Sequence, residues 1–296
     1  MQNLDRINLL IWGRRLGARL VFLACLLLLA SPGWSAAQAK APASSPTKPE
    51  AATPQPGKIL KQACDFLKAA QKFSFKAECT DDRVYSGGKK LQYAFNLEAY
   101  VQRPDKVRIN AAGDLENKQF FFDGQNITLY DRNQNHYAII KAPGTIDTAM
   151  AKANKEYGLR VSLVDLAESN TCALMQKGVK HALYVGEGLV RGVKCHHLAF
   201  DKDNIQWQIW IEAGEKPLIR KLLITQKKLL GSPQWTAYLT DWDFSPRLKD
   251  SLFVFTPPVK ATKIKFVSLK ELAAQQAKPA PAAKKKAARQ GKKKEK

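Results

Sequence analysis

The stretch KCHHLAFDKDNIQWQIWIEAGEKPLIRKLLITQK, residues 194–227, decides the fold because apolar residues recur at every second position in its centre. Ile205, Trp207, Ile209 and Ile211 alternate there with Gln206, Gln208, Trp210 and Glu212. Successive side chains of a strand point to opposite faces of a sheet. The pattern therefore predicts a strand with one buried face, on which large aromatic and branched residues more often form core than line a pocket.

Cys195, His196 and His197 precede this strand and raise the question of a metal or redox centre. Because neighbouring strand residues face opposite ways, His196 cannot join Cys195 and His197 around one small ion. Structural zinc sites mostly need four ligands, and nothing in the sequence brings His136 or His181 to the other two. We therefore predict no metal and no cofactor, and we expect Cys195 to be a core or disulfide residue.

The same period of two recurs along residues 58–267, which form the expected folded domain. Residues 59–72 instead show a helical period of about 3.6. Strands are expected within 73–141, with turns at Gly87-Gly88 and Asp123-Gly124, then helices over 146–157 and 163–176, then further strands within 182–244. This order predicts a mainly β fold with helices (α+β): a large curved antiparallel sheet, or half-open β-barrel, of about 11 strands capped by helices on its concave side.

The two ends of the chain predict export. Residues 1–39 resemble a signal peptide, with Arg14, Arg15 and Arg19, an apolar run over 20–30 and small residues at a cleavage site. Residues 40–57 are rich in Pro and Ala and predict a disordered linker. Residues 268–296 are rich in Lys, Ala and Pro and predict a disordered basic tail. The expected location is the periplasm.

The charge of the chain is strongly positive. Of a formal net charge of +22, residues 1–39 contribute +3 and residues 268–296 contribute +8, which leaves +11 for residues 40–267. An exported protein rarely meets nucleic acid, so we expect none as partner. The tail could bind an anionic membrane or cell-wall surface by counterion release, or could only keep the protein soluble.

Four cysteines remain once the signal peptide, with Cys25, is removed: Cys64, Cys79, Cys172 and Cys195. An even number in an oxidising compartment favours disulfides. Three connectivities are possible. Pairing the two helix cysteines, Cys64 with Cys172, and the two strand cysteines, Cys79 with Cys195, is slightly favoured, and buried free thiols are the alternative.

Several segments also resemble a known family. Residues 195–225 resemble the Cys-Asp-His-Leu-Ala-Phe, Trp-Gln-Leu-Trp-Ile and Pro-Leu-Pro-Arg-Lys signature of the periplasmic domain-of-unknown-function 2092 family. RPDKVRI (103–109), FFFDGQNITLYD (120–131), APGTIDTAM (142–150), YVGEGLVRGV (184–193) and FVFTPPVKATKI (253–264) fit the same pattern. The family is similar in fold to the LolA/LolB lipoprotein carriers, which implies a half-open barrel around an apolar cavity for acyl chains. His196 departs from the pattern, which has Asp there, and Ile219 replaces a Pro.

No nucleophile elbow, phosphate loop, HExxH or dinucleotide fingerprint is present, so no catalytic residue is predicted. The first hypothesis is a non-catalytic carrier or sensor that buries a lipid or other amphiphile, with the segment 145–176 moving to admit it. The expected apolar cavity is lined by Phe73, Phe75, Phe95, Leu97, Trp207 and Ile209. The second hypothesis is a structural or interaction protein of the envelope whose interior is filled by its own side chains. A lipid hydrolase is a third and weaker one.

Overall fold

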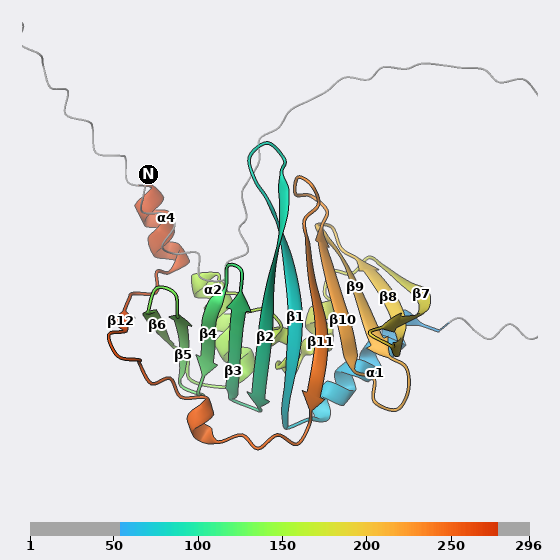
Figure 1. The fold of residues 1–296 in the computed structure, drawn as a ribbon, viewed down its shortest axis with the longest axis horizontal. Helices are drawn as coiled ribbons and strands as arrows, with labels where there is room; N and C mark the ends of the chain where they lie inside the picture. The colour runs from blue at the N-terminus through green and yellow to red at the C-terminus, as the bar shows by residue number, and fades with distance from the viewer. Residues whose placement is uncertain (1–53, 278–296) are drawn as a thin grey trace, which may run out of the picture.

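A computed structural model of the chain describes residues 54–277. The strands of these residues form one twelve-stranded sheet (Figure 1). The strand order is β12-β6-β5-β4-β3-β2-β1-β11-β10-β9-β8-β7. The elements in chain order are α1 (Pro56–Ala69), β1 (Lys72–Val84), β2 (Lys90–Gln102), β3 (Lys106–Gly113), β4 (Asn117–Phe122), β5 (Asn126–Asp131), β6 (His136–Lys141), α2 (Ile146–Tyr157), η1 (Val164–Leu166), α3 (Thr171–Gln176), β7 (His181–Val190), β8 (Val193–Asp201), β9 (Ile205–Glu212), β10 (Ile219–Gln226), β11 (Gln234–Asp243), η2 (Asp250–Leu252), β12 (Thr262–Lys263) and α4 (Leu269–Ala277).

The predicted order of helix, strands, helical insertion and strands is confirmed. β1–β6 and β7–β11 are two runs of sequential antiparallel strands, and β1 pairs with β11 to join them into one sheet. The two-residue strand β12 adds to the expected number by pairing in parallel with β6. The sheet ends at β12 and β7 and does not close, so the predicted curved, half-open sheet is the observed fold.

Helices α1 and α2 lie on one face of the sheet, where the predicted alternation places the core (Figure 1). On β1, every second residue from Phe73 to Cys79 is buried. The apolar side of α1 contributes buried residues such as Leu60 and Leu67 to the same core. Burial of apolar surface stabilises at roughly 25 cal/mol per Å², so this shared face is the main source of stability.

The opposite face carries a smaller aromatic cluster. Phe255, on the chain between β11 and β12, lies 5.1–5.4 Å from the rings of Phe121, Tyr130 and Tyr137. The guanidinium of Arg108 lies 4.7 Å from the Phe121 ring centre. The segment after β11 therefore covers the outer side of β4–β6 before it reaches the β6 edge.

The prediction of one helix over 163–176 is wrong. The structure has a 3-10 turn (η1), an interruption and the short helix α3. Leu163 adopts the left-handed conformation with a φ of 62°, and Ser169 donates from its amide and hydroxyl to the Asp147 carboxylate. The Thr171 hydroxyl lies 2.7 Å from the carbonyl oxygens of both Asp165 and Glu168. Such side-chain bonds compete with the helical ladder and break it.

Two predicted boundaries also differ. Helix α1 begins at Pro56, inside the predicted linker 40–57, and α4 lies inside the predicted tail 268–296. Residues 1–53 and 278–296 lie outside the described residues, and with them the predicted signal peptide and most of the tail. No helix within residues 54–277 is long and apolar enough to cross a membrane.

The cysteine pairing is half as predicted. Cys64 on α1 and Cys172 on α3 form a disulfide with a Cα–Cα distance of 5.6 Å. The pairing of Cys79 with Cys195 is wrong, since both thiols are free and buried. β11, β10 and β9 lie between β1 and β8, which at about 4.8 Å per step separates these cysteines by roughly 19 Å. A disulfide needs Cα atoms within about 7 Å.

Replacing both Cys64 and Cys172 by Ser is expected to lower the free energy of unfolding by about 2–4 kcal/mol, because the bond closes a loop of 108 residues. Urea unfolding followed by circular dichroism measures this. Dithiothreitol should destabilise the wild type by a similar amount and leave the double variant unchanged. A reductant effect on the double variant would contradict the assignment.

Candidate functional site

The six residues predicted to line a cavity lie on the helix-covered face of the sheet. Phe73 and Phe75 lie on β1, Phe95 and Leu97 on β2, and Trp207 and Ile209 on β9. Five of them are buried in the core, and Phe95 is partly buried and packs against it. We call this surface the trough. The sheet order places β11 and β10 between β1 and β9, so the trough spans the centre of the sheet.

The trough residues share one hydrophobic core with the segment 145–176, which we call the lid. Helix α1 also contributes to this core and packs against β7, β8 and β9. Between α2 and α3 the lid has little regular structure, yet its apolar residues are buried: Leu159, Val161, Leu163, Val164, Leu166 and Ala167. Helix α2 adds Ile146, Ala149, Met150 and Ala153. An irregular apolar segment therefore contributes to the core on this face beside the helices.

Trp207 contributes a polar group to this apolar surface. Its ring stacks on Phe200 with centres 4.1 Å apart, and only 5% of the residue is exposed. Its indole Nε1 is buried and has no hydrogen-bond partner among the described residues. A buried donor without an acceptor costs about 1–3 kcal/mol. The trough therefore holds one unsatisfied hydrogen-bond donor.

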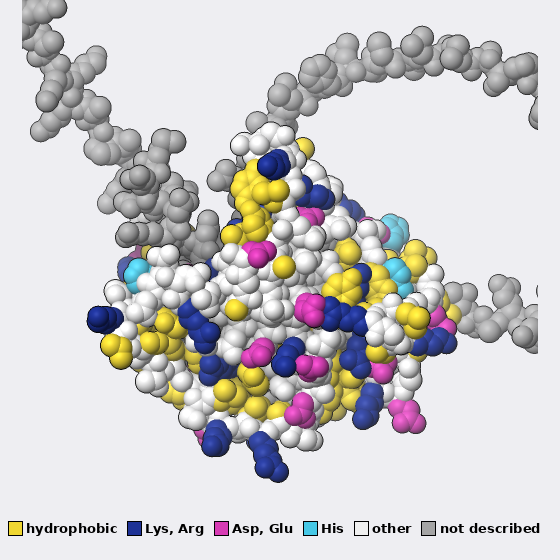
Figure 2. Space-filling model, viewed as in Figure 1, with side chains coloured by type: hydrophobic (Ala, Val, Ile, Leu, Met, Phe, Trp, Pro, Cys, Tyr) yellow, Lys and Arg dark blue, Asp and Glu magenta, His cyan; other side chains and the backbone are white. Residues whose placement is uncertain are grey.

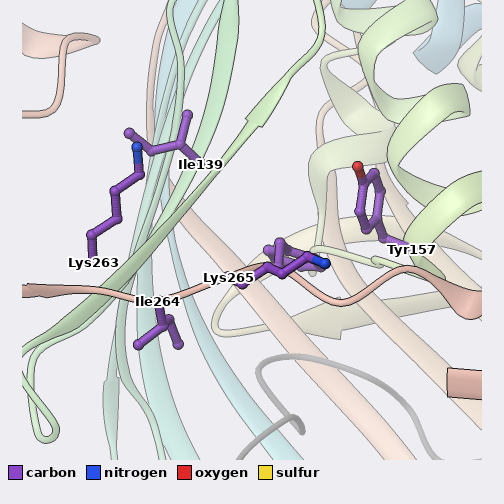
Figure 3. Close-up of a pocket in the computed structure, with 6 residues that line it drawn as sticks. Ile139, Tyr157, Lys263, Ile264 and Lys265 are labelled. Carbon is purple, nitrogen blue, oxygen red and sulfur yellow. The ribbon is translucent and has the colours of Figure 1, made fainter. Parts of the chain in front are cut away.

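A hollow of about 430 Å³ opens at the β6 edge of the sheet, between the segment after β12 and the end of α2 (Figure 3). It is lined by Ile139, Tyr157, Lys263, Ile264, Lys265 and Phe266. Figure 3 shows Lys265 extending toward Tyr157 across the opening. No pattern in the sequence predicts this hollow, because it depends on the short β12–β6 pairing and not on a long alternating pattern.

The trough residues and this hollow are separate. None of the six predicted residues lines the hollow of 430 Å³. Phe95 lines a second one of only about 10 Å³, together with the charged residues Asp81, Arg83 and Glu116. The trough residues therefore lie within the packed core that α1 and the lid share.

Two connections hold the lid to α1. The Cys64–Cys172 disulfide is one. Arg103 is the other, because its guanidinium donates to the carbonyls of Leu67 and Ala70 at the end of α1 and of Leu166 and Ala167 in the lid. In the sequence, Arg103 stands out only as the first residue of the family-like segment RPDKVRI. Nothing in the sequence shows which carbonyls its side chain meets.

His196 and His197 contact different neighbours, as predicted for strand residues that face opposite ways. Nδ1 of His196 lies 3.2 Å from the Tyr184 hydroxyl, whereas His197 donates to Gln208 at 2.9 Å and stacks on Trp210. Burial raises the pKa of the Cys195 thiol to about 11 and that of Cys79 to about 12. A thiol with so high a pKa forms little of the nucleophilic thiolate at neutral pH. Within residues 54–277, no three His, Cys, Asp or Glu side chains gather as a metal site would need.

The family model covers the trough, the lid and the residues that line the hollow. The chain belongs to the family described as "Predicted periplasmic protein (DUF2092)", which matches residues 57–267. The resemblance seen in the sequence is confirmed, and the periplasm is the compartment that the family description gives. A comparison with curated proteins found no match.

Several solved structures are similar to the chain. An uncharacterized conserved protein from Thermus thermophilus has 10% identity and a TM-score of 0.43, covering 70% of this chain and 97% of its own. The Mycobacterium tuberculosis lipoprotein LppX has 12% identity and a TM-score of 0.39, with coverages of 65% and 97%. The LolA superfamily protein NE2245 from Nitrosomonas europaea has 9% identity and a TM-score of 0.34, with coverages of 68% and 97%. At such low identities and TM-scores these likenesses carry no argument about ligand or activity.

Glu168 is a titratable group of the lid with a raised pKa. Burial, with the nearby carboxylates of Asp165 and Asp147, raises the Glu168 pKa from 4.5 to about 7. A carboxyl group with a raised pKa in the folded state binds its proton more tightly there than in the unfolded chain. Its contribution to stability therefore falls as the pH rises from about 4.5 to about 7.

We expect the lid to exchange its amide hydrogens faster at about pH 8 than at about pH 5.5, after correction for intrinsic exchange rates. The Glu168→Gln variant should lose this difference, because its side chain stays neutral at both values. Hydrogen–deuterium exchange of residues 159–176 measures the effect. An equal pH difference in the variant would assign the sensitivity to another group.

Proposed function

We propose that the protein is an exported, non-catalytic periplasmic protein that binds a lipid or other amphiphile in the trough, as a carrier or sensor. The family description supports the compartment. The apolar face of an open sheet, covered by an irregular segment that could be displaced, supports the ligand class. The raised thiol pKa values of Cys79 and Cys195 support a binding role rather than a catalytic one.

The unsatisfied indole Nε1 of Trp207 is the observation that carries the proposal. A ligand that is wholly hydrocarbon would leave this donor unsatisfied. An acyl ester or a fatty acid brings a carbonyl oxygen on an apolar chain, so it could accept from Trp207 while its chain replaces the lid side chains. Relief of one buried unsatisfied donor, about 1–3 kcal/mol, would then favour the bound state.

We propose that the hollow at the β6 edge is the entrance through which a ligand reaches the trough. Tyr157 is the last residue of α2, so the hollow borders the lid directly. Lys263 and Lys265 place positive charge beside the apolar side chains of Ile139 and Phe266. Lys265 is paired with Glu271, whereas Lys263 makes no ion pair with the residues that the structure describes. An anionic head group could therefore remain at this opening while its chain enters the trough.

A second candidate is a structural or interaction protein of the envelope, tethered to an anionic membrane or cell-wall polymer by the basic tail. The observation that favours it is the filled trough, because five of the six predicted residues are buried in one core. In this case the lid would be a permanent part of the core. The tail would provide the contact.

Organic extraction and mass spectrometry of the protein, purified from a bacterial periplasm without detergent, separate the two candidates. The carrier or sensor should yield a lipid or fatty acid near one molecule per chain. A lipid-free protein that also refuses added fatty acid or phospholipid would overturn the lipid-binding proposal and favour the envelope role.

The Trp207→Phe variant tests the hydrogen bond directly. It keeps an aromatic ring beside Phe200 but removes the donor, so affinity for a fatty acid should fall about tenfold, as expected for one lost hydrogen bond. Affinity for a hydrocarbon probe without a carbonyl should stay close to that of the wild type. Equal losses for both probes would show that the ring's volume matters and the donor does not. A thermal melt of the variant checks that it folds.

A further inference from the structure

Two turns lie side by side at one end of the sheet and extend beyond the neighbouring strands (Figure 1). One is the β1–β2 turn, residues 85–89, and the other is the β10–β11 loop, residues 227–233. The Gln234 amide donates to the Asp82 carboxylate at 3.1 Å, and the Lys90 ammonium lies 3.5 Å from the Gly231 carbonyl oxygen. β1 and β2 have 13 residues each while β3 and β10 have eight, which is why this end projects.

The projection exposes large apolar side chains. Leu230 is 74% exposed, Tyr85 45%, Leu229 41% and Leu91 37%. We call these four residues the apolar tip. Figure 2 shows hydrophobic side chains gathered on the projection, with a basic side chain near its end. Single exposed leucines are common on protein surfaces. Here three large apolar residues lie on two adjacent turns and a fourth, Leu91, lies at the start of β2, and patches of this kind mark interaction sites.

Lysines flank the apolar tip in both turns. Lys89 and Lys90 lie in or next to the first turn, and Lys227 and Lys228 directly precede Leu229 and Leu230. Lys90 pairs with Asp82, and Lys227 with Asp201. Lys89 and Lys228 make no ion pair with any described residue. Their charges are therefore available to a negatively charged partner.

We propose that the apolar tip docks on an anionic phospholipid bilayer, with Leu229 and Leu230 entering the boundary between head groups and acyl chains. Leucines at this depth gain from burial, and the lysines, whose long side chains reach back to the head-group level, gain from negative lipid charge. A bilayer fits better than a protein, because a protein interface of standard size takes about 20–30 residues per side and this projection offers far fewer.

The docking surface is separate from the trough. The apolar tip contains none of the six trough residues and none of the residues that line the hollow at the β6 edge. The docking proposal is therefore independent of whether the trough binds a lipid. Its test can be done without any ligand in the trough.

The first test places an environment-sensitive fluorophore on the Leu230→Cys variant of the periplasmic chain with its tail. The native thiols should not react in the folded protein, because Cys79 and Cys195 are buried and Cys64 is bonded to Cys172. Vesicles with equal parts of phosphatidylglycerol and phosphatidylcholine should shift the emission to shorter wavelength, and pure phosphatidylcholine vesicles should do so much less. The matched control is a label at Leu189→Cys on β7, a residue 73% exposed, which should stay in water.

The second test measures vesicle co-sedimentation of the Leu229→Asp/Leu230→Asp variant. Its partition onto the mixed vesicles should fall at least about tenfold, since it loses the burial of two leucines. Leu189→Asp should bind like the wild type, and both variants should melt like the wild type. Unchanged partition, or a label at position 230 that stays in water while the protein binds, would overturn the proposal and assign membrane binding to the basic tail.

Discussion

The pairing of β1 with β11 is the interaction on which the rest of the structure depends. Each half of the chain makes its own run of hairpin-connected strands, and only this ladder joins the two runs into one sheet. It brings Phe73 and Phe75 of β1 onto the same face as Trp207 and Ile209 of β9. Without it, the apolar faces of the two runs would not form the single core that α1 and the lid share. The projecting turns are also neighbours because β1 and β11 are.

The lid combines firm attachment with weak local structure. A disulfide and the Arg103 side chain tie it to α1, while its middle has a left-handed Leu163 and a short 3-10 turn. Apolar burial holds this middle in place, and Glu168 opposes that burial once it is charged. Segments whose stability rests on a few buried contacts are those that open locally. The same contacts that exclude water from the trough are therefore the ones that a bound acyl chain would replace.

The candidate site could be predicted only in part, for physical reasons. Strand alternation placed Phe73, Phe75, Leu97 and Ile209 on a buried face, because the side-chain period of a strand is fixed by its backbone. It also separated His196 from Cys195 and His197. Alternation cannot show whether a buried face encloses a void or is filled, since that depends on which segment packs over it. Here residues 159–167 belong to the core beside α1, and their irregular path has no periodic signal. The hollow near Lys263 depends on a strand of two residues.

The sequence by itself determined the order of the elements, the buried face of each long strand, the separation of His196 from Cys195 and His197, and membership of a periplasmic family. These features follow from local periodicity or from the order of many short segments. Only the tertiary structure decided that Cys64 meets Cys172 while Cys79 and Cys195 stay apart, that Arg103 joins α1 to the lid, that Trp207 keeps an unsatisfied donor and that two turns share a basic, apolar tip. Each of these depends on distances between residues far apart in the chain, which strand order and packing set and local sequence does not encode.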